Sequence, residues 1–100
     1  MAVAVEAVAA LANLAVNDDN EAEIARAGGL EPIIEGAQSQ SVDLVSQSAR
    51  ALRNLSVNPD NQRIIGELGG KPILQRLVNS PNERISQQAT RACINMGLTV

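Results

Sequence analysis

Amide and guanidinium side chains recur at one fixed spacing along this chain, and they are its best candidates for binding chemistry. Seven residues share the spacing, in three sets whose members lie 41 residues apart: Asn13, Asn54 and Asn95; Arg50 and Arg91; Gln47 and Gln88. An amide both donates and accepts hydrogen bonds, so a row of amides can bind a peptide backbone of any sequence. Guanidinium groups form forked hydrogen bonds with carboxylates. If the ligand is a peptide, we expect these groups to favour acidic residues or a terminal carboxylate.

Groups that commonly perform catalysis are scarce. The chain has no histidine and one cysteine, Cys93, which removes the commonest general base and any internal disulfide framework. At the same 41-residue spacing, Cys93 corresponds to Leu11 and Leu52, so we expect it to pack in the core. The acidic residues near Asp18 lack the ligand spacing of a calcium loop, and the glycine pairs lack a phosphate-loop pattern. We predict that the chain is not an enzyme and holds no cofactor and no metal.

Charge and hydropathy exclude other partners. The formal net charge is −3, no block of Lys and Arg occurs, and aromatic residues are absent, so nucleic acid is not an expected partner. The apolar stretch 1–16 is followed by the polar residues 17–20, so it is shorter than the roughly 20 residues that a membrane span needs. It also lacks the basic segment with which a signal peptide begins. We predict a core helix there and no membrane partner. The lone thiol favours a reducing compartment, so we expect a cytoplasmic or nuclear protein.

The sequence around the asparagines repeats as well. The segments EAVAALANLAV (6–16), QSARALRNLSV (47–57) and QATRACINMGL (88–98) align at the 41-residue period. Between them, Gly28 and Gly29 match Gly69 and Gly70 at the same period, after which the register slips by one residue. Matches of this kind over most of the chain indicate an internal repeat.

The residue pattern within each 41-residue repeat unit predicts three helices. A short helix begins near Asp18 or near Pro59 and ends at the glycine pair. A second short helix begins near Pro32 or Pro72. A long helix then covers 43–57 or 83–97. On the first of these long helices, one apolar stripe is expected, formed by Leu44, Ser48, Ala51, Leu52 and Leu55.

These features resemble those of armadillo repeats. The patterns ALANL (10–14) and ALRNL (51–55), the looser ACINM (92–96) and the double glycine carry the resemblance. It implies an all-α, right-handed α-solenoid with about three helices per unit. Residues 1–100 would form a single domain, with the third helix of a partial repeat at 1–17 and complete repeats at 18–58 and 59–100.

The resemblance also implies a function. In the family, the third helices line a concave groove, and their asparagines hydrogen-bond the backbone of an extended peptide, a role that would fall to Asn13, Asn54 and Asn95. Stacking of the helices would set Gln47 beside Gln88 and Arg50 beside Arg91. Nuclear-import members carry a tryptophan where this chain has Ala9, Arg50 and Arg91, so their mode of cargo binding is not expected here.

Three alternatives remain open at this stage. The asparagines could bridge adjacent helices instead of contacting a peptide, and the arginines could be ordinary solvated side chains. The chain could also be a natural or engineered piece of a longer array that associates with itself through uncapped ends. An apolar stripe on the first helix would then be exposed, formed by Val3, Val5, Val8 and Leu11.

Overall fold

A computed structural model describes residues 7–10, 13 and 28–98 of the chain. Residues 7–10 and 13 are helical, and five helices follow: α3 (Leu30–Gly36), α4 (Val42–Leu55), α5 (Pro59–Glu67), α6 (Gly70–Leu77) and α7 (Glu83–Asn95). The described residues contain no strand, and the prediction of an all-α chain is confirmed. The long helices occupy 42–55 and 83–95, so each ends two residues before its predicted limit.

Side-chain caps fix where the two long helices begin. The hydroxyl of Ser41 accepts a hydrogen bond from the backbone N–H of Leu44 at 3.3 Å. The side-chain oxygen of Asn82 does the same for Ile85 at 3.1 Å. Such caps satisfy backbone donors that have no partner within the helix. The polar residue just before each long helix, Ser41 or Asn82, therefore supplies its starting signal.

The glycine pair at 69–70 lies at the short connection between α5 and α6, which consists of Leu68 and Gly69. Gly69 adopts the left-handed conformation with φ 78°, which glycine reaches at no steric cost. Gly70 is already the first residue of α6, and a Cβ there would lie 3.0 Å from the Ile34 side chain and still closer to that of Ile65. The first glycine thus makes the turn, and the second allows α5 and α6 to pack closely.

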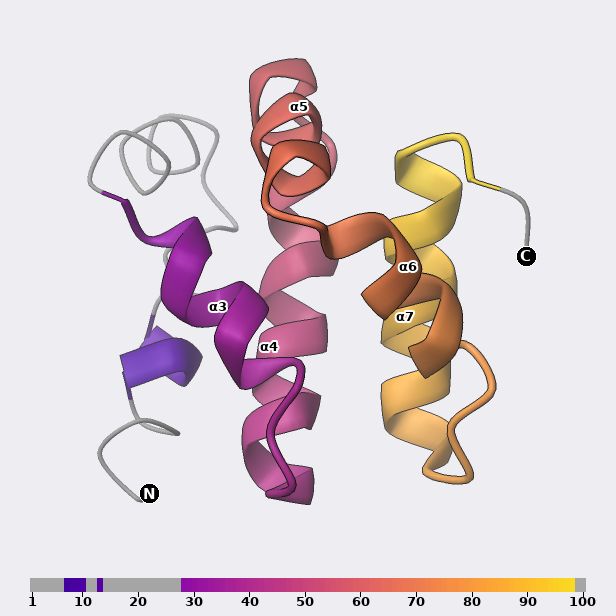
Figure 1. The fold of residues 1–100 in the computed structure, drawn as a ribbon. Coiled ribbons are helices and arrows are strands. Elements are labelled where there is room, and N and C mark those ends of the chain that lie inside the picture. Colours follow the sequence, from indigo (N-terminus) through magenta and orange to yellow (C-terminus); the bar gives the residue numbers. More distant parts are fainter. Residues whose placement is uncertain (1–6, 11–12, 14–27, 99–100) are drawn as a thin grey trace.

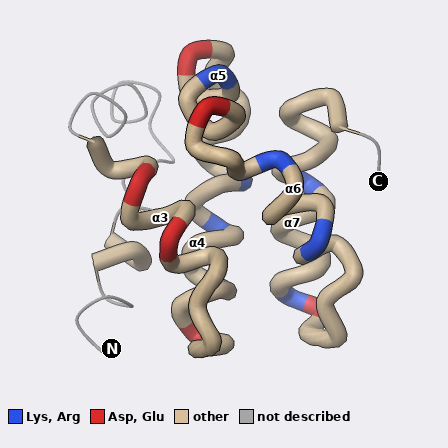
Figure 2. Tube along the Cα trace, viewed as in Figure 1, with Lys and Arg blue, Asp and Glu red and all other residues tan. Residues whose placement is uncertain are grey.

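The helices form two stacked copies of one unit. In Figure 1, α4 and α7 stand side by side, and α3 and α6 cross in front of them. Helix α3 packs on α4, α6 packs on α7, and α4 contacts α7 along its length. Most acidic side chains of the described helices lie on α3 and α5, whereas most basic ones lie on α4, α6 and α7 (Figure 2). The third helices of consecutive units are therefore direct neighbours, and they share a face.

The predicted apolar stripe on α4 is fully buried. Leu44, Ser48, Ala51, Leu52 and Leu55 are all buried in the structure. Cys93 occupies the matching place on α7 and is completely buried, and burial raises the pKa of its thiol. A thiol with a raised pKa stays protonated and is a poor nucleophile, so Cys93 packs in the core, as predicted.

The expected exposure of Val8 is wrong. Its side chain is 3% exposed and belongs to the same core cluster as Leu30, Ile33 and Leu44. The following unit therefore covers Val8, because contact with apolar neighbours removes its surface from water. Val3, Val5 and Leu11 lie outside the described residues. No helix in the described part of the chain is long and apolar enough to cross a membrane.

The contact between α3 and α4 is closest at Gly36. A Cβ at this position would collide with Ser48 Oγ and would lie 3.2 Å from Leu44 Cδ1. Ser48 Oγ is itself buried and makes no hydrogen bond to any described residue. The crossing of α3 over α4 therefore depends on the missing side chain of Gly36.

We predict that Gly36→Ala lowers the free energy of unfolding by about 1–3 kcal/mol, because overpacking outweighs the better helix propensity of alanine. Ser48→Ala alone is nearly neutral or stabilising, since it removes a buried hydroxyl without a partner. Added to Gly36→Ala, it recovers part of the loss. Urea denaturation measures all three variants.

Gly66→Ala provides the matched control. A Cβ at Gly66 meets only the flexible end of Lys71, at 3.3 Å, so this substitution should preserve or raise stability. Equal stabilities of Gly36→Ala and Gly66→Ala would show that the α3–α4 contact does not require a glycine.

Candidate functional site

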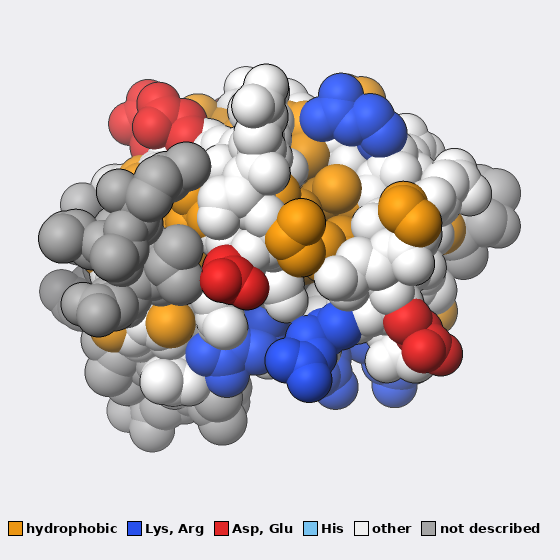
Figure 3. All heavy atoms as spheres, turned by 90° about the horizontal axis from the view of Figure 1, so that it is seen from below, with side chains coloured by type: hydrophobic (Ala, Val, Ile, Leu, Met, Phe, Trp, Pro, Cys, Tyr) orange, Lys and Arg blue, Asp and Glu red, His pale blue; other side chains and the backbone are white. Residues whose placement is uncertain are grey.

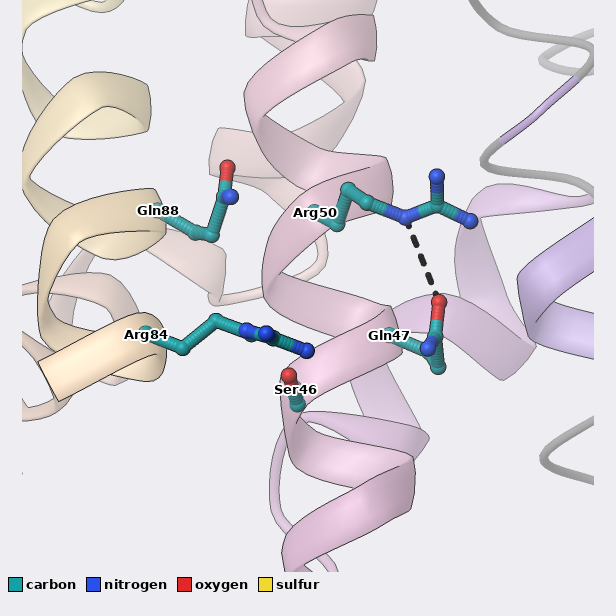
Figure 4. Close-up of a pocket in the computed structure, with 5 residues that line it drawn as sticks. All are labelled: Ser46, Gln47, Arg50, Arg84 and Gln88. Carbon is teal, nitrogen blue, oxygen red and sulfur yellow. Dashed lines mark hydrogen bonds between the residues drawn. The ribbon is translucent and has the colours of Figure 1, made fainter. Parts of the chain in front are cut away.

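Two adjoining hollows lie between α4 and α7, and together we call them the arginine groove. The first hollow has a volume of about 260 Å³, and the second has a volume of about 210 Å³. The first is lined by Ser46, Gln47, Arg50, Arg84 and Gln88 (Figure 4). The second is lined by Arg53, Gln87, Gln88 and Arg91. Each hollow thus combines one arginine from α4 with one from α7, and Gln88 is common to both.

The first hollow contains an arginine that reaches across the groove. Arg84 extends from α7 toward Ser46 on α4, whereas the guanidinium of Arg50 turns away from α7 (Figure 4). Arg50 Nε donates to Gln47 Oε1 at 3.2 Å. Arg50 also donates through Nη2 to the backbone oxygen of Ala9 at 3.3 Å. One face of Arg50 therefore borders the hollow while its head group ties α4 to the preceding unit.

The arginines of the groove carry charge that no described acidic residue neutralises. Neither hollow has an aspartate or a glutamate in its lining. Among the residues that the structure describes, the one ion pair joins Arg63 and Glu67 on α5, at 3.1 Å. Figure 3 shows basic side chains gathered along one edge of the face viewed. Because arginine stays protonated at any physiological pH, this region is permanently cationic although the whole chain has a net charge of −3.

Gln88 connects the two sides of the groove. Its Oε1 accepts a hydrogen bond from Arg53 Nη1 at 3.4 Å, and this bond bridges α4 and α7. Gln88 therefore stands at the boundary between the two hollows, and Arg53 holds its side chain there.

Four of the seven predicted site residues come together in this groove. Gln47 and Gln88 line the same hollow, whereas Arg50 and Arg91 line different ones. The guanidinium of Arg50 is hydrogen-bonded to the Ala9 carbonyl of the preceding unit, and Arg84 extends from α7 toward α4. The placement of Arg50 beside Arg91 stays a prediction.

The groove also includes residues that the repeat pattern alone does not single out. Arg53 matches Ala12 and Ile94 in the other units, so periodicity gives no signal for it. Ser46 matches Gln87 at the repeat period, and both line the groove. A wider helical face, taking in positions next to the recurring ones, would have identified them.

The asparagines take no part in lining either hollow. Asn13 is exposed and Asn54 is half-buried. Asn95, the last residue of α7, donates from Nδ2 to the backbone oxygen of Arg53 and to Ser56 Oγ, both at 3.1 Å. Asn95 therefore bridges adjacent helices, which is the alternative that the sequence left open.

A second amide completes this bridge. Gln62 Nε2 donates to the backbone oxygen of Ser56 at 2.8 Å and to that of Asn95 at 3.1 Å. The carboxyl-terminal ends of α4 and α7 are thus joined by side chains from both α5 and α7. We call Ser56, Gln62 and Asn95 the inter-helix bridge.

We predict that Asn95→Ala lowers the free energy of unfolding by about 0.5–1.5 kcal/mol, because two acceptors at the carboxyl-terminal end of α4 lose their partly buried donor. Asn79→Ala is the control, since Asn79 is exposed and its side chain makes no hydrogen bond to a described residue. It should change stability by less than about 0.5 kcal/mol. Chemical denaturation compares the two, and equal stabilities would remove the structural role of Asn95.

Comparisons with known proteins identify the repeat. Residues 17–57 match the Armadillo/beta-catenin-like repeat. The crystal structure of an engineered protein superposes with a TM-score of 0.87 at 31% identity, over 94% of this chain and 40% of that one. A structure of computationally designed armadillo repeat proteins for modular peptide recognition gives 0.81 at 27% identity, over 88% and 38%.

A designed armadillo repeat protein in complex with the peptide (KR)4 gives a TM-score of 0.83 at 26% identity, over 92% of this chain and 39% of that one. The chain spans about two fifths of the length of these structures. No curated protein sequence matches it. The repeat match, the helix order and the shared architecture agree with one another: residues 17–57 match an armadillo repeat, and the chain has the fold of designed armadillo repeat proteins.

Proposed function

We propose that this chain is a peptide-binding module that performs no chemistry and holds an extended peptide with acidic residues in the arginine groove. The observation that carries the proposal is the set of four arginines between α4 and α7, none of which pairs with a described carboxylate. An acidic peptide would supply the missing charge through forked, charge-assisted hydrogen bonds. The negative net charge of the chain would oppose such a peptide at long range, so the attraction must be local.

Amide side chains give the groove a second means of contact. Gln47, Gln87 and Gln88 lie among the arginines, and an amide can pair with backbone N–H and C=O groups of any residue. Asn13, Asn54 and Asn95 would extend this row toward the ends of the third helices, although the Nδ2 group of Asn95 is already used in the inter-helix bridge. Backbone contacts would hold the peptide extended, and the arginines would select its charge.

The structural neighbours support peptide binding in general and differ in charge preference. One comes from designs for modular peptide recognition, and another was solved with the basic peptide (KR)4. A groove lined by four arginines would repel a basic peptide, because like charges at close range are unfavourable. We therefore propose that this chain uses the architecture for ligands of the opposite charge.

We predict that a short peptide of alternating Glu and Ser binds at least roughly tenfold more tightly than its Gln-Ser counterpart, and that its affinity falls as salt is added. The Lys-Ser counterpart should not bind. Fluorescence anisotropy with a labelled peptide measures these affinities. The double variant Arg84→Gln/Arg91→Gln should remove most of the preference for Glu over Gln.

The matched control is Lys71→Gln/Arg76→Gln, which removes two positive charges from α6, a helix that lines neither hollow. It should leave the preference for acidic peptide unchanged. Equal affinities for the Glu, Gln and Lys peptides would exclude the arginine groove as the site. So would an equal loss of the preference for Glu over Gln in both double variants.

Self-association is a second candidate function, and the exposure of Ile94 favours it. Ile94 is 51% exposed on α7 and stands at the position where α4 carries Arg53, which reaches the next unit. An isoleucine at that position offers apolar contact in place of a polar bridge. A second copy of the chain that covered Ile94 would remove this apolar surface from water.

If the chain associates in this way, its mass in solution rises toward that of a dimer with concentration, and Ile94→Arg keeps it monomeric. Val42→Arg is the control, because Val42 is at least as exposed (57%) but lies at the start of α4. Sedimentation over a wide concentration range measures the mass. A monomer at every concentration would eliminate this second function.

A further inference from the structure

We infer that the arginine groove reads two acidic side chains of one extended peptide, placed at alternate residues, with one carboxylate in each hollow. The inference rests on the proposed function and adds a spacing rule to it. Its basis is the pairing of arginines across the groove: Arg50 with Arg84 in the first hollow, and Arg53 with Arg91 in the second.

Each hollow is equipped to take one carboxylate. A carboxylate accepts hydrogen bonds on two oxygens and has room for several donors. The first hollow provides Arg84, which no described acidic residue neutralises, beside the hydroxyl of Ser46 and the amide of Gln47. The second provides Arg91 and the part of Arg53 not bound to Gln88. Neither lining contains an acidic group that would compete for the ligand's place.

The distance between the hollows sets the spacing of the acids. An α-helix rises about 1.5 Å per residue, so Arg50 and Arg53 are separated by roughly 4.5 Å along α4, and Arg84 and Arg91 by roughly 10.5 Å along α7. The midpoints of the two arginine pairs are therefore roughly 7.5 Å apart. In an extended peptide, alternate side chains point to the same side and are separated by about 6.6 Å. Acids at positions i and i+2 match this distance, whereas adjacent acids point to opposite sides.

Gln88 fits the position between the two acids. It lines both hollows, and its Oε1 is held by Arg53. Its amide nitrogen makes no hydrogen bond to a described residue and can donate to the peptide backbone between the acids. Asp43, in the first turn of α4, lies about 10.5 Å before Arg50 along the helix axis and would discourage a third acid beyond the first hollow.

The test uses peptides of identical composition in which two Asp residues stand at i and i+1, i and i+2, or i and i+4 in a Ser and Gly background. Isothermal titration calorimetry at about 0.15 M salt, where the screening length is about 8 Å, limits the effect of distant charges. The i, i+2 peptide should bind roughly threefold to tenfold more tightly than the other two.

Double-mutant cycles assign each acid to its hollow. In the i, i+2 peptide, each Asp is changed to Asn in turn and is measured against Arg84→Gln and Arg91→Gln. One Asp should couple to Arg84 and the other to Arg91, with Arg76→Gln on α6 as the control that couples to neither. Arg50 is left unchanged because it also holds the Ala9 carbonyl.

The outcomes separate the spacing rule from the proposed function. Equal affinity of the three Asp peptides, or coupling of both acids to the same arginine, overturns the two-hollow inference but leaves acidic-peptide binding in place. Failure of every Asp peptide to bind better than its Asn counterpart overturns both.

Discussion

The structure depends on the close approach of α4 and α7, the third helices of consecutive units. Both helices bury small residues: Ala49 and Ala51 on α4 and Ala89 and Ala92 on α7 are all completely buried. With no side chain beyond Cβ, they let the helices pack face to face without aromatic residues to fill the core, and the chain has none. The core of one unit is thereby continuous with that of the next. Because the two helices stand at short range, polar side chains on their outer face can meet across the space between them, and the arginine groove is a direct consequence of this packing.

Hydrogen bonds at the carboxyl-terminal ends of these helices add direction to the apolar packing. Dispersion and burial bring α4 and α7 together but do not specify how far one slides along the other. Asn95, Ser56 and Gln62 fix that register, because their bonds form only when the last turn of α4 lies beside the last turn of α7. At the other side of α4, Arg50 plays a similar part toward Ala9 of the preceding unit. Two of the polar residues that recur at the repeat period, Arg50 and Asn95, therefore hold the stack in register.

The sequence predicted the repeat, the three helices of each unit and the buried stripe of α4, because periodicity and capping residues are local signals. The sequence also led us to expect Gln47 beside Gln88, and both line the first hollow. It did not predict that Arg50 and Arg84, rather than Arg50 and Arg91, would share a hollow. Equal spacing along the chain fixes where a helix face recurs, but the direction of a long side chain depends on which carbonyl or amide lies within reach in the folded state. The bridging role of Asn95 has the same cause, since its acceptors on α4 are 39 and 42 residues away in sequence.

The division between core and groove explains how one architecture can serve ligands of different charge. The buried faces of α4 and α7 are built from aliphatic residues and set the fold, whereas the groove residues are largely solvent-facing and make few contacts with the core. Exposed charged side chains contribute little to stability, so substitutions among them cost the fold little while altering the electrostatic field of the groove. A designed relative with a similar backbone was solved with a basic peptide, and the groove arginines of this chain are suited to the opposite sign. If the groove binds acidic peptides as proposed, ligand charge is selected by a few exposed positions on a backbone whose geometry is determined elsewhere.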